Sequence, residues 1–168
     1  MIDPAFAVTM ARYNAWQNRS LYAAAATLDD DARRLDRGAF FRSIHGTLSH
    51  LAWGDTVWLA RFTGAAPPQV TIKESPGFMP DWAGLVALRD DLDRRIAAWA
   101  SELTADGLSG DLRWFSGALG RDVAKPKAML VVHMFNHQTH HRGQVHAMLT
   151  AAGARPADTD LFAMPEAQ

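Results

Sequence analysis

Apolar residues recur along this chain mainly at the three-to-four-residue spacing of an α-helix. The clearest stripe lies between residues 81 and 102, and the charged run at 90–95 fits the solvated face of the same helix. We therefore predict a helix over 81–102 with one buried face. The members of its apolar stripe are Leu85, Leu88, Leu92, Ile96 and Trp99.

Residues typical of helix ends indicate three more helices. Asp3 and Pro4 suit an N-cap and a first turn, and an Ala-rich pattern follows them. A strongly apolar run stops at Gly64, which suits a C-terminal cap. Pro126 suits the first turn of a last helix. The four predicted helices span 4–27, 41–62, 81–102 and 126–152.

The segments between the helices differ in character. Residues 28–38 are charged and irregular, and residues 64–80 hold four prolines and two glycines, which predicts a long connection able to cross a bundle. Weak alternation over 108–125 predicts a short β-hairpin, and the tail from residue 154 is expected to be irregular. We predict an all-α fold, a four-helix bundle forming a single domain over 1–168.

Composition narrows the classes of partner. The 17 basic and 18 acidic residues are scattered, so no basic patch predicts a nucleic-acid partner. No apolar segment approaches the ~18 residues of a membrane span, and the N-terminus has no basic region before an apolar stretch. We expect a cytoplasmic protein with no membrane partner. The absence of cysteine excludes thiolate ligands, so any metal must be held by imidazole, carboxylate or carbonyl groups.

Four of the seven histidines fall within nine residues, 133–141. On a helix that advances about 100° per residue, His137 and His141 lie within the apolar stripe, whereas His133 and His140 lie at its edge. Imidazoles four residues apart can bind one ion, although a lone histidine on an apolar face is more often a hydrogen-bonded core residue. A third ligand must come from another helix, and periodicity does not choose between His45 and His50.

Two long motifs span 40–64 and 135–146, and two short ones are Tyr-Asn-Ala-Trp at 13–16 and Asp-Thr-Asp-Leu at 158–161. With these motifs the chain resembles the DinB family of metal-binding bundles over nearly its whole length. The resemblance implies a DinB/YfiT-like four-helix fold, commonly a homodimer, with one divalent metal ion. It also implies that the metal ligands are His50 from the second helix and His137 and His141 from the last.

Three neutral histidines leave a coordination position for water or substrate, which is the composition of a catalytic rather than a structural site. Such an ion can act as a Lewis acid or lower the pKa of water or a thiol. Imidazole donors suit zinc, nickel, copper or iron, and of these we expect zinc or nickel. The resemblance implies a thiol-dependent transferase or isomerase, or a hydrolase, acting on a small molecule or a low-molecular-weight thiol. The alternative is a noncatalytic, damage-inducible metal-binding protein; the catalytic residues are not predicted.

Several residues near the histidines have two interpretations. Gln144 could orient water or a ligand nitrogen, or be exposed. Asp55 could be a general base or accept a hydrogen bond from a metal-binding histidine, or it could be solvated or form a salt bridge. Arg142 and His146 point away from the ligand pair, which favours ion pairing or a subunit contact. Gly143 in mid-helix suggests the close approach of another helix. Core filling is favoured over cavity lining for the aromatic residues Trp53, Trp58, Trp82, Trp99 and Phe135.

Overall fold

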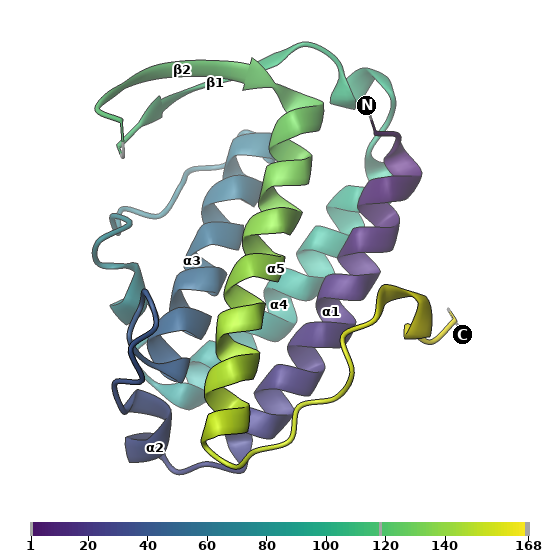
Figure 1. The fold of residues 1–168 in the computed structure, drawn as a ribbon. Helices are drawn as coiled ribbons and strands as arrows, with labels where there is room; N and C mark the ends of the chain where they lie inside the picture. The colour runs from purple at the N-terminus through teal and green to yellow at the C-terminus, as the bar shows by residue number, and fades with distance from the viewer. Residues whose placement is uncertain (1, 118, 167–168) are drawn as a thin grey trace.

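Four long helices form the body of the protein in a computed structural model that describes residues 2–117 and 119–166. Helices α1 and α3 each pack against both α4 and α5, so α1 and α3 lie diagonally opposite each other in a four-helix bundle (Figure 1). This arrangement confirms the predicted fold class. The described helices are α1 (Pro4–Ala26), α2 (Asp30–Arg34), α3 (Ile44–Thr63), α4 (Trp82–Glu102) and α5 (Lys127–Ala151).

Side-chain caps fix where three of these helices begin. The carboxylates of Asp3 and Asp81 and the hydroxyl of Ser43 each accept a hydrogen bond from the backbone N–H three residues later. The cap at Ser43 starts α3 at residue 44, later than the predicted residue 41. Gly64 ends α3 with φ of 76°, as predicted for a left-handed C-terminal cap. None of the described helices is both long and apolar enough to cross a bilayer.

The connections place two further structures beside α3 and α5. The connection over 64–81 returns along the outside of α3, so that α3 and α4 run parallel (Figure 1). The predicted hairpin is confirmed as β1 (Asp111–Ser116) paired antiparallel with β2 (Arg121–Pro126). Pro126 therefore closes β2 and precedes α5, and does not lie in its first turn. The prediction that residues 28–38 are irregular is wrong for the residues that form α2.

The core has two apolar parts separated by a polar layer. One part joins the C-terminal half of α1 to the first turns of α3 and α4, and the other joins the opposite ends of the four long helices. Buried polar side chains occupy intermediate positions on all four helices, which places them between the two apolar parts. Asn14, Asn18, Asp55, Arg89, Gln138 and Arg142 are members of this polar layer.

The tail after α5 is held along α1 (Figure 1). The Tyr13 hydroxyl donates to the carbonyl of Thr159 at 2.6 Å, and the Gln17 amide donates to the carbonyl of Asp158 at 3.0 Å. A short 3₁₀ turn follows at Leu161–Ala163. The tail, which was predicted to be irregular, is therefore held in place by hydrogen bonds to buried side chains of α1.

Candidate metal centre

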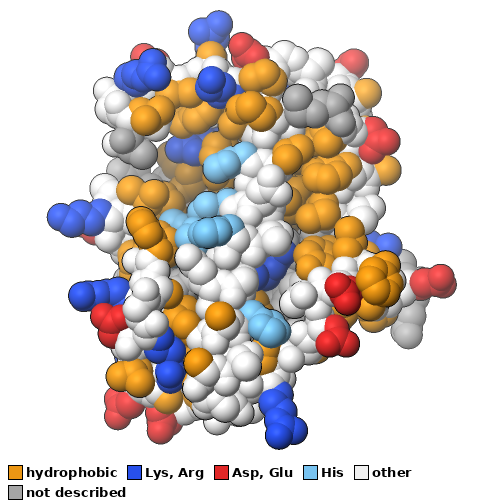
Figure 2. Space-filling model, in the orientation of Figure 1, with side chains coloured by type: hydrophobic (Ala, Val, Ile, Leu, Met, Phe, Trp, Pro, Cys, Tyr) orange, Lys and Arg blue, Asp and Glu red, His pale blue; other side chains and the backbone are white. Residues whose placement is uncertain are grey.

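Three histidines from α3 and α5 meet in the middle of the bundle. One ring nitrogen from each of His50, His137 and His141 lies within 4.8 Å of the other two. The Nε2 atoms of His50 and His137 are 3.1 Å apart. His50 and His141 are buried and His137 is partly buried. Figure 2 shows histidine side chains gathered at the centre of one face, beside a hollow bordered by hydrophobic residues.

His45, the alternative third ligand, does not join this cluster. Its Nε2 lies 2.8 Å from the carbonyl oxygen of Met79, to which it donates. Its ring also packs beside Trp82, with 6.2 Å between the ring centroids. The structure thereby places His50, the residue implied by the resemblance, with the α5 pair.

Hydrogen bonds to Nδ1 orient two of the three imidazoles. The Ser75 hydroxyl donates to the carbonyl of Ile72 at 2.7 Å, so its oxygen accepts the Nδ1–H of His50 at 2.7 Å. The Nδ1–H of His141 is donated to Oε1 of Gln144 at 2.8 Å. Each ring therefore keeps an unprotonated Nε2, the atom available to a metal ion. Gln144 thus hydrogen-bonds a histidine of the cluster, and its role beside a bound metal stays a prediction.

The environment keeps the three imidazoles neutral at physiological pH. Burial, together with the neighbouring imidazoles, lowers the pKa of His50 and of His137 to about 3. Burial also lowers the pKa of His141, although its hydrogen bond to Gln144 opposes this shift. Neutral imidazole is the form that binds metal, so these rings need no deprotonation before coordination.

The cluster fits one divalent ion. Two nitrogens that bind the same ion at 2.0–2.1 Å with tetrahedral angles are separated by roughly 3.3 Å, close to the separation in the His50–His137 pair. Three imidazoles and no thiolate suit zinc, nickel, copper or iron. The three histidines could therefore hold a metal ion and leave a coordination position for a substrate or water.

Two residues that were not predicted as part of the site pack against the cluster. The Phe41 ring stacks on His50, with 3.8 Å between centroids at an interplanar angle of 24°. A Cβ at Gly54 would lie 3.2 Å from Cε1 of His137, so glycine leaves room for this imidazole. The glycine at residue 54 interrupts a helical pattern, and such a glycine is a sequence signal of close packing. Ser75, in contrast, lies in a connection whose path no local pattern reveals.

Two charged residues near the cluster in sequence have other partners. The Asp55 carboxylate forms a buried ion pair with Arg89 at 2.6 Å, which is the salt-bridge interpretation. Burial raises the pKa of Asp55 to about 6 although Arg89 opposes this, so the carboxylate is ionised at neutral pH. Arg142 is buried, donates to Asn14 and lies over the Tyr13 ring. The prediction of an ion-paired or subunit-contact Arg142 is wrong, because α1 covers it.

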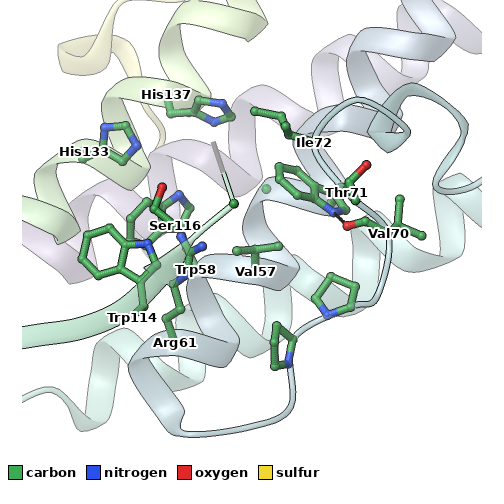
Figure 3. A pocket seen from close by; sticks show the side chains of 15 residues that line it. Val57, Trp58, Arg61, Val70, Thr71, Ile72, Trp114, Ser116, His133 and His137 are labelled. Carbon is green, nitrogen blue, oxygen red and sulfur yellow. Dashed lines mark hydrogen bonds between the residues drawn. The ribbon is translucent and has the colours of Figure 1, made fainter. Parts of the chain in front are cut away.

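A cavity of about 540 Å³ adjoins the cluster at His137 (Figure 3). Trp53 and Trp58 line it, but Trp58 also belongs to one of the two apolar clusters, so the prediction that the aromatic residues fill the core is wrong only for Trp53. It is right for Trp82, Trp99 and Phe135, which pack in the apolar clusters. At Gly143 an added Cβ would meet no described atom within 4 Å, so no helix of this chain approaches it closely.

The protein therefore belongs to the class of helical bundles with a candidate metal centre. It is a four-helix bundle, and a three-histidine cluster lies between two of its helices. Comparison with known families matches the DinB family over residues 1–168, and the chain belongs to that family. It is similar to Protein DinB of Bacillus subtilis (strain 168), with 26% identity over 162 residues. The match covers 92% of this chain and 91% of that relative.

Proposed function

We propose that this protein is a metal-dependent enzyme whose three histidines hold one divalent ion, zinc or nickel, beside a substrate cavity. The reaction class we favour is a thiol-dependent transfer or isomerisation, with hydrolysis as the neighbouring class. The observation that carries this proposal is the cavity of about 540 Å³ that adjoins His137, because a closed structural site needs no such space. A bound ion would supply Lewis acidity, which favours the thiolate or hydroxide form of a nucleophile.

The chain itself supplies orientation and a proton acceptor. Ser75 and Gln144 fix two of the imidazoles, and Phe41 shields one face of His50 from water. His133 also lines the cavity, and its ring centroid lies 6.0 Å from that of His137. Burial and the charge of Arg61 lower the pKa of His133, so its neutral ring can accept a proton from a thiol or water.

The second candidate is a noncatalytic, stress-related metal-binding protein. The observation that favours it is the absence of any carboxylate among the described residues that line the cavity. Asp55, the nearest acidic candidate in sequence, is committed to Arg89. Under this proposal the ion has a structural or storage role and the cavity takes no reacting substrate.

Elemental analysis of tag-free protein, purified without chelators, tests the metal site. We expect nearly one zinc or nickel per chain in the wild type and its loss in His137→Ala. His146→Ala, which changes another α5 histidine outside the cluster, should retain the metal. Absence of metal even after incubation with both ions would contradict the proposal.

A substrate screen separates the two candidates. Metal-loaded protein should be supplied with low-molecular-weight thiols and electrophiles, and separately with esters and amides. Turnover that a chelator abolishes and that His141→Ala lacks supports the enzyme. A metal-loaded protein without turnover in either set favours the noncatalytic role. The proposal places the reaction in the cytoplasm, where low-molecular-weight thiols are kept reduced.

A further inference from the structure

The cavity beside His137 has mostly apolar walls and one full positive charge. Its apolar surface comes from aromatic side chains of α3 and β1 and from the connection after α3 (Figure 3). Arg61 is its charged residue, and no acidic residue and no second arginine or lysine is among the described residues that line it. The cavity lining includes Trp53, Val57, Trp58, Pro68, Ile72 and Trp114.

Arg61 is held in place by aromatic rings and not by an acid. Its guanidinium carbon lies 4.6 Å from the ring centroid of Trp58 and 5.2 Å from that of Trp114. These cation–π contacts fix the plane of the guanidinium, and no hydrogen bond joins its N–H groups to another residue in the described part of the chain. Among the described residues, no Asp or Glu forms an ion pair with Arg61. Burial lowers the pKa of this partly buried side chain.

A positioned, partly desolvated arginine with free donors is typical of a site for an anion. The more deeply buried Arg89 and Arg33 have protein partners, since Arg89 pairs with Asp55 and Arg33 donates to two carbonyls. Arg61 is less buried and has no such partner among the described residues, and it lines a cavity large enough for a small molecule (Figure 3).

We propose that Arg61 binds the carboxylate of a small carboxylic acid whose planar apolar body occupies the cavity. A carboxylate matches the two parallel N–H groups of a guanidinium, and a single cation suits a monoanion better than a phosphate dianion. The Trp53 and Trp114 rings provide flat surfaces for an aromatic or other planar body. The ligand class follows from the cavity walls alone.

The position of the reacting end rests on the proposed function. Arg61 lies seven residues after Gly54, where an added Cβ would lie 3.2 Å from His137, so two turns of α3 separate the two ends of the cavity. Two turns correspond to roughly 10 Å along the helix axis. A substrate with its carboxylate at Arg61 would therefore extend its other end toward the histidine cluster, where a thiol or water would react with it.

Calorimetric titration of metal-free protein tests the carboxylate preference without any contribution from a metal ion. The probes are 3-phenylpropionate and 3-phenylpropanamide, which differ little in shape but differ in charge. We expect the wild type to bind the carboxylate at least about tenfold more tightly than the amide. Arg61→Gln should remove this difference and retain amide binding, whereas Arg61→Lys should retain part of the preference. Arg113→Gln, on an exposed neighbour in β1, is the matched control and should bind both probes like the wild type.

Equal affinity of the wild type for the two probes, or an unchanged preference in Arg61→Gln, would overturn the inference. If Arg61→Gln does not fold, the wild-type comparison decides alone. Metal binding by the same variants is measured separately on protein purified without chelators: a carboxylate preference in a protein that never binds metal would retain this inference and reject the proposed function. Metal binding without a carboxylate preference would do the reverse.

Discussion

At the scale of single residues, the candidate metal centre depends on which nitrogen of each imidazole carries the proton. The Ser75 oxygen accepts from Nδ1 of His50, and Oε1 of Gln144 accepts from Nδ1 of His141. Both bonds leave Nε2 unprotonated toward the other rings. Partners of this kind typically change metal affinity by 10- to 100-fold when removed.

Ser75→Ala should therefore weaken metal binding without removing a ligand. Loss of the acceptor frees the His50 ring to rotate or to change tautomer, and we expect a fall in affinity of roughly 10- to 100-fold. Competition with a chromophoric chelator measures this change. Ser101→Ala, at an exposed serine of α4, controls for the loss of a hydroxyl. Equal affinities of Ser75→Ala and the wild type would show that the hydrogen bond does not orient His50.

At the scale of elements, the candidate metal centre depends on the close packing of α3 against α5. Glycine at residue 54 permits this packing, because a Cβ there would lie 3.2 Å from Cε1 of the His137 imidazole. Gly143 lies in the middle of α5 with open space around it, so the two glycines have different roles.

Gly54→Ala should displace the His137 ring by a few tenths of an ångström and lower metal affinity by roughly tenfold, as does the loss of a supporting contact. Gly143→Ala should leave affinity unchanged and raise thermal stability, because alanine is favoured in a helix by up to about 1 kcal/mol. Chelator competition and thermal unfolding measured on both variants compare these effects. Wild-type affinity in Gly54→Ala would mean that the helices adjust their spacing without cost.

Local sequence patterns predict most of these elements because their ends and buried stripes are encoded within a few residues. Asp3 and Gly64 act as caps where the pattern predicts them, and α4 begins within one residue of the predicted position. Helix α2 has only five residues, too few to show a helical period. The interior face of α5 was predicted incompletely, since buried Gln138 and Arg142 look like surface residues in the sequence. The partner of Arg142 is Asn14, 128 positions away.

At the scale of the whole molecule, the site combines information that no single segment contains. The spacing of His137 and His141 predicts a shared ligand face, but the choice of His50 over His45 needed the family resemblance. Ser75 reaches His50 only because the connection after α3 returns along that helix. Arg61 was not a candidate, since its importance depends on the cavity formed between α3, α5 and the hairpin.

The burial of His45 makes the stability of the whole bundle sensitive to acid. Burial lowers the pKa of His45 from its usual value of 6.5, and its Nδ1 is buried without a hydrogen-bond partner among the described residues. The folded protein therefore keeps this ring neutral where the unfolded chain takes up a proton. The stability contributed by the neutral ring is fully present above pH 6.5 and is lost as the pH falls toward the lowered pKa.

His45→Gln tests this source of acid sensitivity because the glutamine amide can still donate to the Met79 carbonyl but does not titrate. The free energy of unfolding of metal-free protein should be measured in urea at several pH values between 7 and 5. We expect a shallower fall in the variant, by at most about 1.4 kcal/mol per pH unit, the limit for one proton. Identical slopes in the two proteins would place the proton uptake on other groups, such as the buried histidines of the candidate metal centre.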